Sequence, residues 1–335
     1  MDDLTSGMIA LLSFSGIGPK AVLSYFEENI GNDNKLYFHN LDKSNVKMIK
    51  KAIDAEVLTS TSWNDAIQKA KKIIEDSSEK GIRIINSYED QYPQNFKRLP
   101  NRPILIYAKG NIELLNQDKS VAIIGTRDPS NFGKKMGYKI SMLLAAKGYS
   151  IVSGLAKGVD TEAHQGALSV LGKTVAILAH GLDMPVYPKE NRKLAEKILE
   201  SGGLLLSTYS NGTKLFPQYL AARDEWQSGL SDGVIVIETG IKGGTNITVG
   251  HAIKQKKPIA VLDHRQFKDG ELAEIKQFQG NVKYILENKA DPIYTEHSIA
   301  IFDKKICNSK IKEETKEDVQ KINVSSVYAQ EELFE

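Results

Sequence analysis

Short runs of apolar residues alternate with longer amphipathic segments through most of the chain after Gly81. The runs are rich in valine, isoleucine and leucine without interleaved polar residues, which is typical of strands covered on both faces. The segments between them have the length of helices, so the pattern predicts repeated βα units on a doubly wound, mainly parallel sheet. The predicted strands are 121–124, 150–152, 174–178, 204–206, 234–237 and 259–262, with 82–85 and 104–107 as edge strands. Helices are expected to begin near Asn131, Thr161, Asn191, Tyr219 and Thr245.

The pattern differs at the two ends of the chain. Residues 4–30 predict two short helices around a tight turn at residues 15–19, because proline is favoured at the first position of a helix. After Asp291 the alternation fades into a polar stretch rich in lysine and glutamate. We therefore expect an all-α domain at 1–80, an α/β domain at 81–290 and a polar tail of marginal order at 291–335.

Composition narrows the class of protein. Hydrophobic residues make up 41% of the chain, which is enough for a sizeable core, and no apolar run has the roughly 18 residues of a membrane span. The start, Met1-Asp2-Asp3, lacks the basic residues of a secretory signal, and one cysteine cannot form an internal disulfide. We expect a cytoplasmic protein. The net charge of +2 does not predict nucleic-acid binding, so any basic surface must be local.

Three predicted strands are followed by loops that contain glycine, a hydroxyl side chain and one cation. These loops include Gly125-Thr126-Arg127, the stretch from Ser153 to Asp160, and the stretch from Glu238 to Asn246. Glycine lets the backbone approach an anion closely, the hydroxyl adds a hydrogen bond, and the cation neutralises charge. Because ligands of doubly wound sheets bind beyond the carboxyl ends of the strands, the loops predict a pocket for a phosphate-bearing ligand.

Several familiar sites are missing from the sequence. The first strand is not followed by Gly-x-Gly-x-x-Gly, which disfavours NAD, and there is no Gly-x-x-x-x-Gly-Lys-Ser/Thr loop of a P-loop ATPase. The six histidines have no metal-ligand spacing, and no nucleophile elbow is visible. We expect no cofactor, no metal site and no catalytic step.

A series of motifs in the centre of the chain resembles the DprA/Smf family of DNA-processing proteins. The similarity covers roughly residues 85–262. It rests on the runs 121–127, 151–160, 181–188 and 203–207, on Phe216-Pro217 and Gly229-Leu-Ser-Asp232, and on the lead-in segments Tyr92-Pro93 and 103–110.

The resemblance implies a Rossmann-like core that binds single-stranded DNA in a basic pocket, dimerises and helps to load RecA in recombination or natural transformation. Carried over by motif, Arg127 and Lys157 are candidate phosphate contacts, and Phe216 could stack on a base or pack into the core. The full set of candidate DNA- or phosphate-binding residues is Gly125, Thr126, Arg127, Ser153, Gly154, Lys157, Gly158, Lys214, Phe216, Arg223, Lys242, Gly243, Gly244 and Thr245.

The chain departs from the family pattern after Phe216-Pro217. Where the family has Arg-Asn-Arg, the best registration places Arg223 on the first arginine and leaves Asp224 and Glu225 in the other two positions. A carboxylate in a groove lined with phosphates is unfavourable, because like charges repel. Either the groove is displaced or the ligand differs.

Two other hypotheses remain open at the level of sequence. The pocket could serve a sensor or hydrolase of a nucleotide-derived small molecule, with Glu238 or Asp160 as the acid/base group, although Asp160 also fits a helix cap. Alternatively, the chain is a scaffold in which the N-terminal helices and the tail bind partners. The turn at Gly16-Ile17-Gly18-Pro19 resembles the hairpin of a helix-hairpin-helix or SAM-like module, which fits either DNA contact or a structural role.

Overall fold

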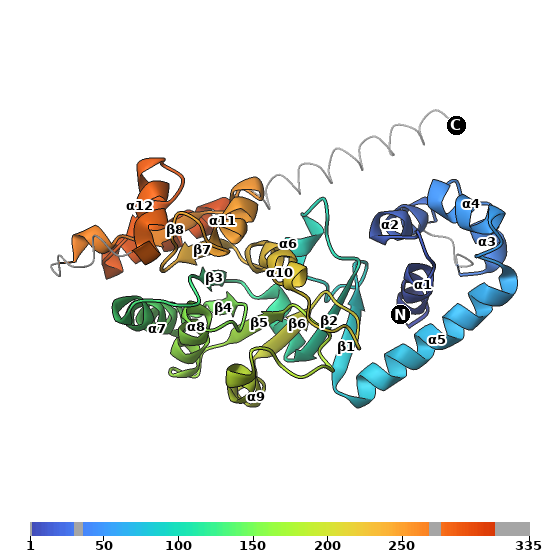
Figure 1. Cartoon of the computed structure of the whole chain (residues 1–335), viewed down its shortest axis with the longest axis horizontal. Helices are drawn as coiled ribbons and strands as arrows, with labels where there is room; N and C mark the ends of the chain where they lie inside the picture. The colour runs from blue at the N-terminus through green and yellow to red at the C-terminus, as the bar shows by residue number, and fades with distance from the viewer. Residues whose placement is uncertain (1, 30–35, 268–275, 312–335) are drawn as a thin grey trace, which may run out of the picture. The chain divides into compact units, whose positions relative to one another are not determined.

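The computed structural model describes residues 2–29, 36–267 and 276–311, which fold into two units (Figure 1). The units interleave along the chain. The first contains residues 1–118 and 171–223, and the second contains 119–170 and 224–335. The predicted core of 81–290 is therefore divided, because the chain leaves the first unit after Asp118 and returns at Leu171.

The first unit begins with helices. They are α1 (Asp2–Leu12), α2 (Pro19–Glu28), α3 (Phe38–Asp42), α4 (Lys47–Asp54) and α5 (Ser60–Glu79). Gly16 adopts the left-handed conformation (φ +84°) in the turn before α2, where Pro19 is the first helical residue as predicted. A capping box of Thr59 and Ser62 starts α5, and α1 and α5 pack on each other and on the following strand.

The strands of the first unit run in both directions. Its strands are β1 (Ile82–Asn86), β2 (Leu105–Gly110), β5 (Thr174–Leu178) and β6 (Leu204–Ser207), in the order β1-β2-β6-β5. The β1–β2 and β2–β6 pairs are antiparallel, whereas β5 and β6 are parallel. The helical elements are α6 (Gln94–Lys97), η1 (Ile112–Asn116), η2 (Lys189–Asn191) and α9 (Arg192–Glu200), and α10 (Pro217–Leu230) continues into the second unit.

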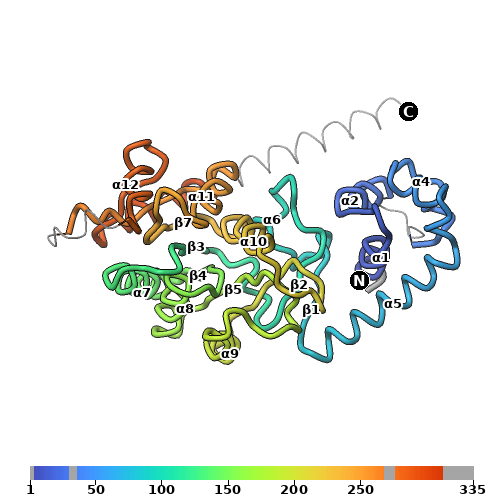
Figure 2. Tube along the Cα trace, viewed as in Figure 1, coloured from blue at the N-terminus to red at the C-terminus, as the bar shows by residue number. Residues whose placement is uncertain are grey.

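The sheet of the second unit is entirely parallel within its described strands. These are β3 (Ser120–Ile124), β4 (Ser150–Ser153), β7 (Gly233–Val236), β8 (Ile259–Leu262) and β9 (Asp291–Ile293), in the order β4-β3-β7-β8-β9. The helical elements are α7 (Asn131–Ala146), α8 (Val159–Leu168), α11 (Thr245–Lys254), η3 (His264–Gln266), η5 (Lys276–Phe278) and α12 (Gln279–Leu286). Residues 296–311 are also helical, and the Cα trace of the unit can be followed in Figure 2.

One face of this parallel sheet carries a hydrophobic core. Alternate strand residues, such as Val121 and Ile123, pack with Ile140 and Leu144 of α7 and with Ala163 of α8. Helices α11 and α12 pack on β7 and β8 and lie on the other side of the strands in Figure 1. The unit is thus a doubly wound, Rossmann-like layer structure, as the apolar runs predicted.

The sequence prediction is confirmed for the six central strands, each within one residue, and for the five helix starts, each within two. It is wrong for residues 291–311, which were predicted to be tail and form β9 and a helical stretch. The physical reason is a narrow apolar stripe of Ile299, Phe302 and Ile306, which enters the core cluster between polar neighbours. Residues 312–335 of the predicted tail lie outside the described residues. Among the described helices, none has the length and apolar character to span a membrane.

Candidate functional site

The loops that follow β3, β4 and β7 meet at the carboxyl edge of the second unit's sheet. The backbone N–H of Thr126 donates to the carbonyl oxygen of Glu238 at 2.8 Å, which ties the first loop to the end of β7. The N–H of Val159 donates to the carbonyl oxygen of Thr126 at 3.2 Å, which ties the second loop to the first. We call the predicted residues of these loops, Gly125–Arg127, Ser153–Gly158 and Lys242–Thr245, the glycine edge.

Two glycines are required where the first two loops touch. Gly158 has φ +81°, and a Cβ atom there would lie 2.5 Å from the carbonyl oxygen of Thr126 and 2.7 Å from that of Arg127. A Cβ atom on Gly125 would lie 2.5 Å from a methyl group of Val159. The close approach of the two loops therefore depends on residues without side chains.

The cations of the glycine edge are exposed to solvent, whereas Ser153 and Gly154 of its second loop are buried. Arg127, Lys157 and Lys242 are all exposed. Ser153 is fully buried and its Oγ donates to the carbonyl oxygen of Ile123 at 2.7 Å, while Gly154 is also buried. Ser153 and Gly154 therefore shape the site from beneath, and the exposed side chains of the edge are those of the cations.

Asp160 holds the second loop in place. Its Oδ2 accepts hydrogen bonds from the N–H groups of Gly154 at 3.1 Å and Ala156 at 3.2 Å, and the residue is buried in the first turn of α8. A carboxylate in this position satisfies backbone donors and favours the helix N-terminus electrostatically. Asp160 therefore orders the loop before α8, whereas the start of α8 at Gly158 has no side-chain cap, so the structure does not show the helix cap that the sequence left open.

Glu238 has a similar role at the end of β7. Its carboxylate is fully buried and accepts hydrogen bonds from the N–H of Ser130 at 2.8 Å and from the Ser130 Oγ at 2.5 Å. The Nε2 of His264 lies 3.3 Å from Oε1, and the His264 ring stacks on Phe278. Burial raises the pKa of Glu238, but the hydrogen bonds from His264 and Ser130 outweigh it and leave the pKa below its usual value.

The burial of both carboxylates bears on the hydrolase hypothesis. A general acid or base must reach the substrate within hydrogen-bond distance, and Glu238 has no exposed surface in the structure. Asp160 is 6% exposed and engaged with its own loop. The arrangement orders the loops and leaves neither carboxylate facing an open site.

The third loop is held by two asparagines that the sequence analysis did not single out. The Nδ2 of Asn246 donates to the carbonyl oxygens of Gly240 and Ile241, both at 3.1 Å. The Oδ1 of Asn281, a fully buried residue of α12, accepts from the N–H of Thr239 at 3.0 Å. Asn246 stands two residues after the predicted glycines, so its position in the sequence could have indicated a role in this loop. Asn281 is distant along the chain, and nothing in the sequence indicates its role.

The remaining predicted residues belong to the first unit. Lys214 is exposed, and Phe216 has 46% of its surface exposed, so Phe216 is not a core residue. Its ring meets Tyr219 edge to face at 5.4 Å between centroids, and Tyr219 stacks on Tyr209 at 4.4 Å. The sequence analysis missed Tyr209 and Tyr219, whose only signal is their spacing from Phe216.

Arg223 is placed differently from what a phosphate contact requires. It is 3% exposed, and its Nη1 donates to the carbonyl oxygen of Ile177, near the end of β5, at 2.8 Å. A charge-assisted hydrogen bond of this kind fixes α10 to the strand of its own unit. The guanidinium therefore has a structural contact, with little surface left for a ligand.

The two carboxylates that replace Asn and Arg of the family pattern also have local partners. The Oδ1 of Asp224 accepts from Gln227 at 2.9 Å. Glu225 lies 3.9 Å from the ring of His251 on α11. Since α11 begins at Thr245 and rises about 1.5 Å per residue, His251 is roughly 9 Å along the helix from the glycine edge. Glu225 is therefore not one of the groups that line the glycine edge.

Comparison with known proteins identifies the family of the chain. The family model of DNA recombination-mediator protein A matches residues 83–302. The chain belongs to this family. It is 32% identical over 217 residues to DNA processing protein DprA of Bacillus subtilis, which covers 65% of this chain and 72% of that protein. It is 38% identical to DprA of Streptococcus pneumoniae over 52% of this chain and 60% of the relative.

Solved structures of the family extend the match. DprA of Streptococcus pneumoniae superposes with a TM-score of 0.67 at 26% identity, over 89% of this chain and 97% of that one. DNA processing protein A of Helicobacter pylori, whose structure was described for its single-stranded DNA binding mode, gives 0.58 at 28% identity over 68% and 96%. The resemblance to the DprA/Smf family and the Rossmann-like fold predicted from the sequence are confirmed.

Proposed function

We propose that the glycine edge binds the phosphates of single-stranded DNA and that the chain performs no chemistry on the strand. Arg127, Lys157 and Lys242 would neutralise the charge of the phosphates. The observation that carries this proposal is the contact between the first two loops at Gly158, which places two cation-bearing loops side by side.

The family supports DNA as the ligand. A relative of this chain, DNA processing protein A of Helicobacter pylori, binds single-stranded DNA according to the description of its structure. The absence of a reachable acid or base at Glu238 and Asp160 supports a binding role over the hydrolase alternative.

The aromatic cluster of Phe216, Tyr219 and Tyr209 is the second part of the proposal. An exposed ring can stack on any base, because every base offers a π-face. The Phe216 ring contacts Tyr219 edge to face, and Tyr219 in turn stacks on Tyr209. The exposed Lys214 lies two residues before Phe216 and is suited to a neighbouring phosphate. Stacking of this type is worth about 1–3 kcal/mol per base.

The wider role of the chain is also a proposal. We infer that it acts in the cytoplasm as a homodimer and assists a RecA-type recombinase during recombination or transformation, as the family resemblance implies. Sedimentation at several protein concentrations tests the dimer, and co-sedimentation with purified RecA on DNA tests the second contact. A monomer at all concentrations would contradict the homodimer. An amount of RecA in the pellet no greater than in a control with DNA alone would contradict the RecA contact.

An electrophoretic shift with a short single-stranded oligonucleotide at low salt tests the central proposal. Arg127→Ala removes one charged contact and should weaken binding by about tenfold, which corresponds to the lower end of the 1.5–3 kcal/mol of a charged hydrogen bond. Lys193→Ala on α9, an exposed cation outside the glycine edge, is the matched control. No shift with the wild-type chain, or equal loss in both variants, contradicts the proposal.

A further inference from the structure

A basic hollow lies in the second unit, at the end of its strands opposite to the glycine edge. Its cavity of about 630 Å³ is lined by residues from three stretches of chain, 256–259, 288–291 and 301–309. Ile259 is the first residue of β8 and Asp291 is the first residue of β9. Because the glycine edge follows the carboxyl ends of parallel strands, this hollow at the amino ends is a separate site.

Lysine dominates the hollow. Five lysines line it, Lys256, Lys257, Lys289, Lys304 and Lys305, against the single carboxylate of Asp291. Five positive charges less one negative charge leave +4, while the whole chain carries only +2. Lys305 lies 2.6 Å from Asp291, and Lys289 lies 2.7 Å from Glu287, just outside the lining. With Glu287 counted as well, five positive and two negative charges leave +3 in one place.

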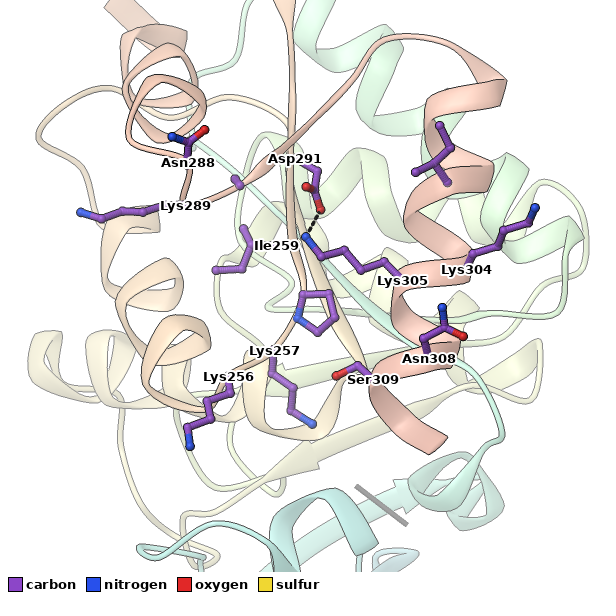
Figure 3. A pocket seen from close by; sticks show the side chains of 13 residues that line it. Lys256, Lys257, Ile259, Asn288, Lys289, Asp291, Lys304, Lys305, Asn308 and Ser309 are labelled. Atoms are coloured by element: carbon purple, nitrogen blue, oxygen red, sulfur yellow. Dashed lines mark hydrogen bonds and ion pairs between the residues drawn. The ribbon is translucent and has the colours of Figure 1, made fainter. Parts of the chain in front are cut away.

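Figure 3 shows how the hollow is arranged. Lys305 extends from the helical stretch 296–311 towards Asp291, and Asn308 and Ser309 lie on the same stretch. Lys256 and Lys257 come from the turn after α11, and Asn288 and Lys289 from the turn after α12. The floor is apolar, with Pro258 and Ile259. Amides, a hydroxyl and ammonium groups around an apolar floor suit a ligand with phosphates and a less polar sugar or base.

Helix termini alone do not explain this set of lysines. Lysines after the last turn of a helix are favoured by the helix dipole, which accounts for Lys256, Lys257 and Lys289. Lys304 and Lys305 lie within the helical stretch 296–311 and not after its last turn, so the dipole of their own helix does not account for them. Lys256 and Asn288 both hold left-handed backbone conformations, with φ of +57° and +52°. Each follows the C-cap residue of its helix, and the N–H groups of Lys257 and Lys289 donate to the carbonyl oxygens of Ala252 at 3.0 Å and Tyr284 at 2.9 Å, so these conformations are ordinary helix endings.

We infer that this hollow binds the phosphate backbone of a nucleic-acid strand, as a second contact besides the glycine edge. The inference rests on the proposed function, because it takes the ligand to be the same class of strand. Lysine suits such a role, since its ammonium is a point charge on a flexible stem and reads no sequence. An acidic protein segment is the competing ligand, and the experiment separates the two.

The experiment measures binding of a fluorescent oligonucleotide of about thirty nucleotides by anisotropy over a series of salt concentrations. The variants Lys256→Ala/Lys257→Ala and Lys304→Ala/Lys305→Ala each remove two lysines from one wall. Lys193→Ala/Lys197→Ala on α9 removes two exposed lysines elsewhere and is the control. Thermal midpoints establish that all variants are folded.

We expect each wall variant to bind about threefold to tenfold more weakly than the control. The plot of log K against log salt should also become less steep by about 1.4, because each lost phosphate contact on a single strand contributes about 0.7. A wild-type chain that binds DNA, with wall variants equal to the control, overturns this inference and leaves the proposed function intact.

Two further outcomes also decide the matter. If the wild-type chain binds no oligonucleotide, the proposed function and this inference both fail. If polyglutamate displaces the oligonucleotide from the wild-type chain but not from the wall variants, at equal charge concentration, the hollow is assigned to acidic protein segments and the inference is overturned.

Discussion

At the scale of single residues, the glycine edge depends on the lack of a Cβ atom at Gly158. Gly158 allows the carbonyl groups of Thr126 and Arg127 to lie where a Cβ atom would stand. The contact with Gly158 in the neighbouring loop thus sets the backbone position of Arg127. The side chain of Arg127 does not set it. This explains how an exposed arginine can be presented in a defined place on a loop.

Gly158→Ala should separate this steric role from the ordinary cost of a left-handed residue. Gly148 has nearly the same φ, +84°, but no atom within 4 Å of an added Cβ, so Gly148→Ala controls for the positive φ, while the ψ of Gly158, −128°, lies outside the left-handed helical region and adds its own cost. We expect Gly148→Ala to cost about 1–2 kcal/mol and Gly158→Ala about 1–3 kcal/mol more, because the loop must shift. Urea denaturation measures the stability. Oligonucleotide binding should fall only in Gly158→Ala, and equal binding by the two variants would contradict the role given to the contact.

The lowered pKa of Glu238 predicts how the free energy of unfolding depends on pH. A carboxyl whose pKa is lower in the folded state stabilises the protein above its unfolded pKa, and this contribution is lost as the pH falls through the folded value. The free energy of unfolding of the wild-type chain should therefore decrease as the pH falls below about 4.5, the usual value for glutamate. Glu238→Gln should be less stable at pH 7 by about 1–3 kcal/mol and should lose less stability between pH 5 and pH 3. Parallel curves of wild type and variant would show that Glu238 does not contribute in this range.

At the scale of elements, the helical stretch 296–311 tests how the sequence was interpreted. Phe302 is 1% exposed and belongs to the core cluster, whereas the adjacent Ile301 is 56% exposed. Phe302→Ala should destabilise the chain by about 3–5 kcal/mol, and Ile301→Ala by less than about 0.5 kcal/mol. Chemical denaturation of both variants measures the difference. A small effect of Phe302→Ala would mean that the stretch behaves as the polar tail first predicted.

The elements that the sequence predicted well are those with continuous apolar runs. The segment 174–178 is buried throughout, and a short continuous apolar run of this kind is typical of a strand covered on both faces. The stretch 296–311 was missed because only one residue in every three or four is apolar and faces the core. The average polarity of the stretch therefore resembles that of a tail. Strand β9 was missed because three residues, one of them proline, carry too short a pattern.

The same distinction applies to the site. Glycine loops after strands can be found from the sequence, because the topology of parallel strands brings them to one edge. The burial of Arg223 against Ile177 could not be predicted from a motif alignment, since a motif does not state which way a side chain points. Asn281 and Tyr209 were missed because their partners are distant along the chain or lack a recognised spacing.

At the scale of the whole molecule, the net charge of +2 means that long-range attraction cannot supply the affinity for DNA. Binding must come from local cations. If Arg127, Lys157 and Lys242 are the only phosphate contacts, log K should fall with log salt at a slope of about −2.1, at roughly 0.7 per contact. A steeper slope indicates further contacts. A slope near zero, measured by anisotropy over a series of salt concentrations, would contradict a phosphate-binding site of any kind.

The interleaving of the two units has a consequence for synthesis on the ribosome. The strands β5 and β6 of the first unit are made only after β3 and β4 of the second, so the first unit has its last strand only when residue 207 has been translated. The strands β3 and β4 of the second unit are translated before β7, β8 and β9 and lack these partners until then. The nascent chain thus exposes unpaired strand edges of both units at once, a situation in which chaperones protect edges from pairing with other chains.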